Sequence, residues 1–215
     1  MLKAVLFDVD GVLLDSFEAN LKFYQDLMKH AGHRSPTREE YRPFFHLSMR
    51  DLIPKFSGLT EEDEINKIWE IGRKREVRYP DELVKMPSDI EEAIGSLGEK
   101  YILGIVTGRV KENILKTGGL EKLKKLFTVV VGYQDTENHK PDPEPLLFAC
   151  KKLKIKPSEA VYVGDAEGDI TAGKSAGMKT ILFHPDNKFD NADAHASSFK
   201  DLPGVIEAIS HSLLI

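Results

Sequence analysis

Two aspartates stand one residue apart, directly after a short apolar run near the start of the chain. The run is Ala4–Phe7, and Asp8 and Asp10 follow it before a glycine, Gly11. A short apolar run of this kind predicts a buried parallel strand, and open α/β sheets bind ligands at the carboxyl ends of such strands. Alternate side chains of an extended segment share a face, so both carboxylates are expected on one side. Such a pair suits phosphoryl transfer, with one nucleophile and one acid/base group.

A second polar segment, Thr107-Gly108-Arg109, directly follows the predicted strand 101–106. A hydroxyl and a backbone amide at a strand end can together hold a phosphate oxygen. An ordinary turn explains the same residues, and Arg109 either contacts phosphate or points to solvent.

Two further charged segments follow later in the chain. Lys140 precedes a proline-rich turn at 141–145, where a fixed cation would neutralise a reacting phosphoryl group. Asp165 and Asp169 come after the predicted strand 160–163. We expect Asp165 to supply a hard oxygen ligand for a metal ion, and Asp169 to lie near Lys140 or next to the metal ligands. The alternatives are a surface lysine before a helix and two helix N-caps.

Composition limits the classes of protein to which the chain can belong. Its 215 residues are 41% hydrophobic and 30% charged, with a formal net charge of -5. These values favour a globular protein with one large domain and an insertion, or two small domains. Nucleic-acid binding is disfavoured, and the basic triplet at 73–75 is interpreted as a solvated helix face.

Cysteine content and hydropathy predict the cell compartment. Cys150 is the single cysteine, which fits a reducing environment. No stretch of eighteen apolar residues occurs. We therefore expect a cytoplasmic protein without a membrane partner.

The elements that must position these side chains fall into two groups. Residues 17–77 show helical spacing with many aromatic residues, whereas strands alternate with helices after Pro87. That alternation predicts an α/β fold with a Rossmann-like, largely parallel sheet covered by helices on both faces. The expected elements after Pro87 are strands at 101–106, 127–131, 160–163 and, last, 180–183, and helices at 145–153, at 170–176 and through Ile114 and Leu115.

The four polar segments, in this order and each after a predicted strand, resemble the haloacid dehalogenase-like hydrolase superfamily. The Asp-x-Asp-Gly-Val opening, Thr107, the lysine before the proline-rich turn and the Gly-Asp-x-x-x-Asp segment carry the resemblance. The helical region after the first motif is similar to the cap of the phosphoglycolate phosphatase-like branch. The resemblance implies a catalytic core at 1–15 and 87–215 and a cap at 16–86.

The resemblance also implies a Mg²⁺-dependent phosphatase that acts on a small phosphomonoester. Asp8 would form an aspartyl-phosphate, and Asp10 would act as acid and base. Thr107, Gly108, Lys140 and the backbone amides of Val9 and Asp10 would hold the phosphoryl group. Mg²⁺ would bind Asp8, Asp165 and the backbone carbonyl of Asp10, while Asp169 would orient the cluster. The expected partner is a small phosphate ester, and the expected assembly is a monomer or a homodimer.

The cap segment 43–52 resembles a specificity loop. We expect His46 and Arg50 to bind a carboxylate or a second phosphate of the substrate, although packing at a helix start explains them equally well.

Other functions within the superfamily stay open. A sugar-phosphate mutase similar to β-phosphoglucomutase shares the fold and the opening motif, and a pyrophosphatase is also possible. Dehalogenases lack the second acid, Asp10, and a phosphonate-cleaving relative would need an activated cap lysine that nothing in the sequence marks. A regulatory module is disfavoured because Asp8, Asp10, Lys140 and Asp165 are all present.

Overall fold

The computed structural model describes residues 1–183 and 191–212. Its centre is a six-stranded sheet in which all neighbouring strands are parallel, in the order β3-β2-β1-β4-β5-β6. The strands are β1 (Ala4–Phe7), β2 (Ile102–Val106), β3 (Phe127–Val131), β4 (Ala160–Gly164), β5 (Lys179–Phe183) and β6 (Ala194–Ala196). The first strand lies between β2 and β4, so the residues after these three strands meet at one edge of the sheet.

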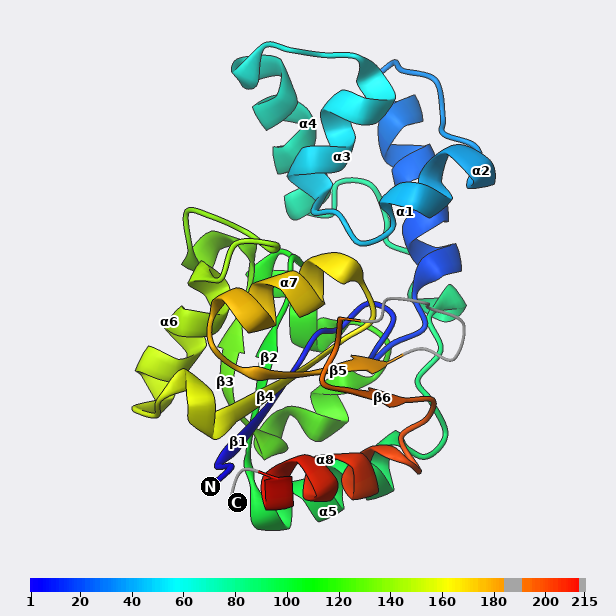
Figure 1. Cartoon of the computed structure of the whole chain (residues 1–215). Helices are drawn as coiled ribbons and strands as arrows, with labels where there is room; N and C mark the ends of the chain where they lie inside the picture. The colour runs from blue at the N-terminus through cyan, green and yellow to red at the C-terminus, as the bar shows by residue number, and fades with distance from the viewer. Residues whose placement is uncertain (184–190, 213–215) are drawn as a thin grey trace.

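Helices cover both faces of this sheet (Figure 1). The α5 (Ile90–Lys100) and α8 (Leu202–Ser212) helices lie on one face, and α6 (Glu144–Leu153) and α7 (Glu167–Ser175) lie on the other. Alternate residues of β1 divide between the two apolar layers, with Val5 and Phe7 in the first and Ala4 and Leu6 in the second. Burial on both faces explains why β1 is continuously apolar rather than alternating.

A group of helices stands above the carboxyl ends of the strands (Figure 1). It contains α1 (Phe17–His30), α2 (Arg38–Tyr41), α3 (Met49–Ser57) and α4 (Glu62–Arg73), and we call it the helical segment. An apolar cluster of its own, with Leu27, Tyr41, Leu52 and Ile53 fully buried, holds these helices together. The helical segment therefore has an interior separate from the two layers of the sheet.

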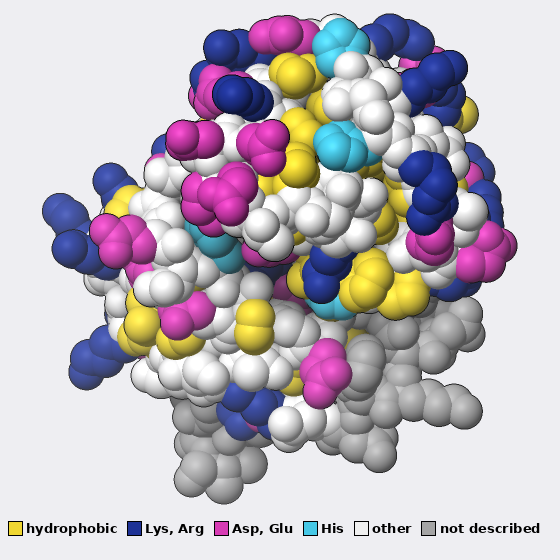
Figure 2. Space-filling view, turned by 90° about the horizontal axis from the view of Figure 1, so that it is seen from above, with side chains coloured by type: hydrophobic (Ala, Val, Ile, Leu, Met, Phe, Trp, Pro, Cys, Tyr) yellow, Lys and Arg dark blue, Asp and Glu magenta, His cyan; other side chains and the backbone are white. Residues whose placement is uncertain are grey.

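Two chain crossings join the helical segment to the sheet. At Asp15 and Lys85 the crossings pair with each other, since each backbone N–H donates to the other residue's carbonyl oxygen at 2.9 Å. Figure 2 views the helical segment from above and shows acidic and basic side chains interspersed around it. No continuous basic patch covers that face of the described residues.

The structure corrects two expectations about the second half of the chain. The stretch around Ile114 and Leu115 is not α-helical but forms two 3₁₀ helices, η3 (Lys111–Lys116) and η4 (Leu120–Leu126). The strand at 180–183 is not the last, because β6 pairs alongside it and α8 follows. A three-residue strand is too short to produce a periodic signal. No helix among the described residues has both the length and the apolar character needed to cross a bilayer.

Candidate active site

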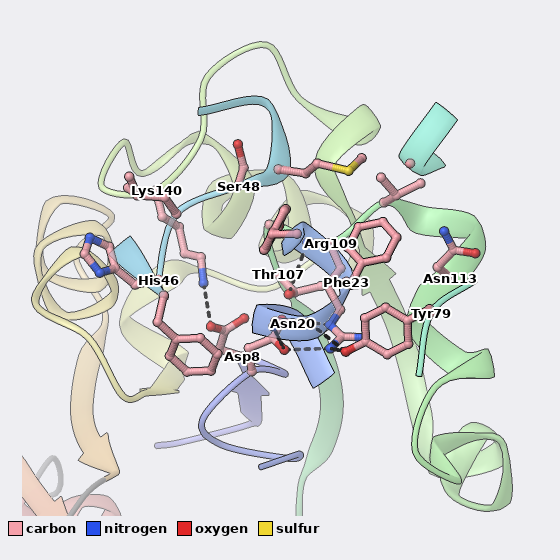
Figure 3. A pocket seen from close by; sticks show the side chains of 18 of the residues that line it. Asp8, Asn20, Phe23, His46, Ser48, Tyr79, Thr107, Arg109, Asn113 and Lys140 are labelled. Atoms are coloured by element: carbon pink, nitrogen blue, oxygen red, sulfur yellow. Dashed lines mark hydrogen bonds and ion pairs between the residues drawn. The ribbon is translucent and has the colours of Figure 1, made fainter. Parts of the chain in front are cut away.

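The fold brings the polar segments of the sequence to one edge of the sheet. Asp8 follows β1, Thr107 follows β2 and Asp165 follows β4, while Lys140 comes from the chain between β3 and α6. Figure 3 shows Lys140 reaching down to Asp8, with Thr107 nearby. Four segments that are far apart in sequence therefore meet as their positions after the strands predict.

Lys140 is the central cation of this site. Its Nζ lies 3.1 Å from Oδ2 of Asp8 and 2.6 Å from Oδ1 of Asp169, and it donates to the hydroxyl of Tyr162 at 2.8 Å. Burial alone would lower the pKa of Lys140, but the charges of Asp169 and Asp8 outweigh it and raise the pKa above its usual value. The ammonium group is therefore positively charged at every physiological pH.

Three carboxylates gather beside this lysine. Asp8, Asp165 and Asp169 each offer an oxygen, and these oxygens lie within 4.8 Å of one another. Asp169 already accepts hydrogen bonds from the backbone N–H groups of Asp165 and Ala166, both at 3.2 Å. Burial raises the pKa of Asp8 to about 6, and burial with the neighbouring Asp169 and Asp8 charges raises the pKa of Asp165 well above its usual value.

This cluster fits a hard divalent cation such as Mg²⁺. Oδ1 of Asp8 is buried and has no hydrogen-bond donor, although an unsatisfied buried acceptor is costly. Carboxylate oxygens are the ligands that Mg²⁺ prefers. A cation bound between Asp8 and Asp165 would satisfy that oxygen and offset the repulsion that raises both pKa values.

Gly11 allows the loop after β1 to pack against the cluster. Its φ of +77° lies in the left-handed region, and a Cβ atom there would stand 2.1 Å from Oδ2 of Asp165. A side chain at this position would displace that carboxylate, which explains why a glycine follows the aspartate pair.

The carboxylate of Asp10 lies in a separate network of hydrogen bonds. It accepts bonds from Arg109, at 2.7 Å from Nε and 2.6 Å from Nη2, from Asn20 at 3.0 Å, and from the hydroxyl of Ser16. Burial would raise the pKa of Asp10, but the charge and hydrogen bonds of Arg109 outweigh it and lower the pKa. The sequence did not show whether Arg109 contacts phosphate or solvent, and in the structure its guanidinium pairs with the carboxylate of Asp10.

The two aspartates line one cavity between the sheet and the helical segment. Its volume is about 100 Å³, and Thr107, Gly108 and Lys140 also line it. His46 from the helical segment also lines the cavity, and its contact with substrate stays a prediction. The side chain of Val9 lies in the core instead, so only its backbone can take part in the site.

Arg50 does not join this site. Its guanidinium donates to Asn66 at 2.5 Å and to Glu62, so it links α3 to α4. The prediction that Arg50 binds substrate is therefore wrong for this arrangement, because the side chain is used within the helical segment.

The interpretation of Arg75 as part of a solvated helix face was also wrong. Instead, Arg75 follows the end of α4 with a φ of 55° and lines the cavity. Tyr79 and Asn20 line it too, and none of the three carries a local motif. They meet only because the two chain crossings lie side by side, which a sequence pattern does not reveal.

Comparison with known proteins agrees with this geometry. The family model for haloacid dehalogenase-like hydrolases matches residues 5–183. The chain belongs to this family. This hydrolase is 34% identical over 180 residues to the pyrophosphatase PpaX of Bacillus cereus, which covers 83% of the chain and 82% of that protein.

Solved structures share the fold of this hydrolase. A provisionally named phosphoglycolate phosphatase from Lactobacillus plantarum superposes with a TM-score of 0.82 at 20% identity, over 95% of this chain and 99% of that one. The β-phosphoglucomutase of Clostridium difficile superposes with a TM-score of 0.81 at 21% identity, over 98% and 96%. At these identities the likeness establishes the α/β fold and leaves the substrate open.

Proposed function

We propose that this hydrolase removes the phosphoryl group of a small phosphate ester through an aspartyl-phosphate on Asp8. One observation carries the proposal. The carboxylate of Asp8 stands at the end of the central strand with one buried oxygen free of donors, 3.1 Å from the Lys140 ammonium group. A carboxylate so placed can attack phosphorus while the adjacent cation offsets the charge of the phosphoryl oxygens.

The proposed reaction has two displacements. An oxygen of Asp8 forms a bond to phosphorus while the bond to the leaving oxygen breaks. Asp10 gives that oxygen a proton, which requires its carboxyl group to separate from Arg109 and become protonated before this step, because the ion pair lowers its pKa. Water then attacks the phosphorus, Asp10 takes its proton, and Asp8 and inorganic phosphate are released. Lys140, Thr107, Gly108 and the backbone amides of Val9 and Asp10 hold the phosphoryl oxygens during both steps.

Asp8, Asp165 and the backbone carbonyl of Asp10 would hold Mg²⁺, as the family resemblance implies. The ion would supply positive charge that reduces the repulsion between the carboxylates and the substrate dianion. Asp169 keeps Lys140 and the loop at 165–166 in place through the hydrogen bonds described above.

We propose residues 16–86 as a cap over a core of residues 1–15 and 87–215. The separate apolar cluster of the helical segment and the paired crossings at Asp15 and Lys85 support this division. Movement about those crossings would admit substrate and then exclude water from the cavity. The side chain of His46 would then contact the leaving group.

Pyrophosphate is a second candidate substrate. The identity to PpaX proteins named as pyrophosphatases favours it, and the same site chemistry would serve a phosphoanhydride. A mutase is a third outcome, which the experiment below also detects.

The test is Mg²⁺-dependent phosphate release from phosphoglycolate, pyrophosphate, nucleotides and sugar phosphates. We expect Asp8→Asn to lower kcat by at least about 10³-fold, because the nucleophile is lost. Asp63→Asn, on the exposed side of α4, is the matched control and should retain full activity. Retained activity in Asp8→Asn would contradict the proposal, and isomerisation of β-glucose 1-phosphate without phosphate release would identify a mutase.

A further inference from the structure

Two arginines lie against the ring of Tyr79 in the cavity. The guanidinium carbon of Arg75 is 5.2 Å from the ring centroid, and that of Arg109 is 5.5 Å away. The Tyr79 hydroxyl accepts from Arg109 at 3.0 Å and donates to Asn20 at 2.7 Å. Figure 3 shows Tyr79 and Arg109 together, away from the Lys140 end of the cavity. This end faces the helical segment, where the leaving group of a substrate bound at Asp8 would extend.

The three cations that line the cavity differ in how tightly they are paired. Lys140 lies between Asp8 and Asp169, and Arg109 is paired with Asp10 at 2.6 Å. Arg75 has only a 3.5 Å contact with Asp81 and a 2.8 Å hydrogen bond to the hydroxyl of Thr117. Arg75 is therefore the least tightly paired of the three, and an anion that approached this partly buried guanidinium would offset the cost of its burial.

The backbone of Arg75 supports a functional role. Its φ of 55° is left-handed, a conformation that disfavours side chains and that glycine adopts freely. Its N–H donates to the Gly72 carbonyl at 3.1 Å, and the next residue closes the end of α4 by donating to Ile71 at 3.1 Å. The position ends the helix, a task glycine performs without strain, so the arginine side chain has to be explained by what it contacts.

The walls of this end limit what it can hold. Phe23, Tyr24 and Met49 supply apolar surface, and a Cβ on Gly72 would stand 2.5 Å from Sδ of Met49. The cavity has a volume of about 100 Å³, so the space beside Asp8 suits a small group. Small size and the loosely paired guanidinium of Arg75 together favour a compact anion.

We propose that Arg75, with Arg109 beside the same ring, binds negative charge on the leaving group. The preferred substrates would then carry a carboxylate or a second phosphate on a small leaving group. This inference rests on the proposed phosphatase function and deepens it, since it assigns the residues that select the substrate class.

The experiment compares substrates that differ in the charge of the leaving group. One pair is 2-phosphoglycolate and 2-hydroxyethyl phosphate, which tests a carboxylate, and the other is 1,3-propanediol bisphosphate and 3-hydroxypropyl phosphate, which tests a phosphate on the same type of ester. We expect kcat/KM of the wild type to favour the charged member of at least one pair by about tenfold or more, the usual effect of a charge-assisted hydrogen bond.

Arg75→Gln should reduce that ratio by about tenfold, mainly through a higher KM for the charged substrate. Arg75→Lys should retain part of the preference, because it keeps the charge but loses the planar fork. Arg78→Gln is the control, since Arg78 is exposed and its ion pair is with Glu82 on the same short segment; we expect wild-type rates and ratio.

If Arg75 has only a structural role, Arg75→Gln will slow the hydrolysis of both members of a pair by the same factor. The ratio of their kcat/KM values would then be unchanged, which would overturn the inference. Equal wild-type rates within both pairs would also overturn it while leaving the phosphatase proposal intact. A wild type that hydrolyses none of the four would contradict the proposed function itself.

Discussion

Tyr162 fixes the position of Lys140 more directly than its place inside a strand suggests. Its hydroxyl accepts from Lys140 at 2.8 Å and donates its single proton to the Val106 carbonyl at 2.9 Å. The side chain is fully buried in β4, and Val106 ends β2 on the other side of β1, so the hydroxyl is held between two strands of the sheet. The phenol therefore transmits the rigidity of the sheet to the cation of the site.

Replacing Tyr162 with phenylalanine should loosen that cation without removing it. We expect Tyr162→Phe to lower kcat/KM by about tenfold, since Lys140 keeps Asp8 and Asp169 but loses its fixed acceptor, and to cost about 1 kcal/mol of stability. Steady-state kinetics with inorganic phosphate as competitor would show weaker phosphate binding. Tyr101→Phe, a half-buried tyrosine outside the site, is the control; an unchanged phosphate inhibition constant in Tyr162→Phe would refute the positioning role.

Local sequence pattern was sufficient for residues that follow strands and insufficient for the others. The positions of Asp8, Thr107 and Asp165 could be predicted because apolar runs locate strand ends. Arg109 follows a strand too, but the sequence did not say what it contacts. Asn20, Arg75 and Tyr79 are far apart in sequence and meet only in the folded chain, so no spacing predicts them. Arg50 shows the opposite error, since closeness to His46 in sequence did not bring both side chains into the cavity.

At the level of elements, the strands were predictable because burial on both faces makes them continuously apolar. The predicted strands 4–7 and 127–131 have the bounds that the structure gives to β1 and β3. The region at 111–126 was harder, because 3₁₀ and α-helical turns share similar apolar spacing over a few residues. Tertiary packing, which the sequence pattern does not contain, decided between them.

The helical segment provides a prediction at this scale. Leu52 is fully buried in its apolar cluster, so Leu52→Ala should cost about 2–5 kcal/mol within that cluster. If residues 16–86 unfold as their own unit, amides of α1, α3 and α4 will exchange with deuterium faster, whereas those of β1, β2 and β4 will not. Hydrogen exchange followed by mass spectrometry measures this.

Val161→Ala in β4 is the matched control for that experiment, because it truncates a fully buried residue of the other apolar interior. We expect it to speed exchange in the sheet. Uniformly faster exchange throughout both parts in Leu52→Ala would show that the chain unfolds as one unit and would contradict the proposed division.

At the scale of the whole molecule, the carboxylate cluster that the proposed reaction needs lowers the stability of the metal-free protein at neutral pH. The pKa values of Asp8 and Asp165 are raised in the folded protein, Asp8 to about 6 from 3.8. The folded state therefore holds these protons more tightly than the unfolded state. Their contribution to stability is fully present below the unfolded pKa and is lost as pH rises through the folded pKa. At neutral pH the metal-free protein should thus be less stable than an otherwise identical chain with one fewer carboxylate.

Asp165→Asn tests this balance by removing one charge while nearly keeping the shape of the side chain. In EDTA at pH 7.5 we expect a gain on the order of 1 kcal/mol, or a Tm higher by about 2–4 °C, with a smaller gain at pH 5 because the wild-type carboxyls are then partly protonated. Added Mg²⁺ should raise the Tm of the wild type by ligand linkage and leave that of the variant unchanged. Glu167→Gln, an exposed neighbour, is the control. A variant that melts below the wild type in EDTA would show that Asp165 stabilises the fold, and it would refute the idea that a bound cation is what makes this cluster of negative charge tolerable.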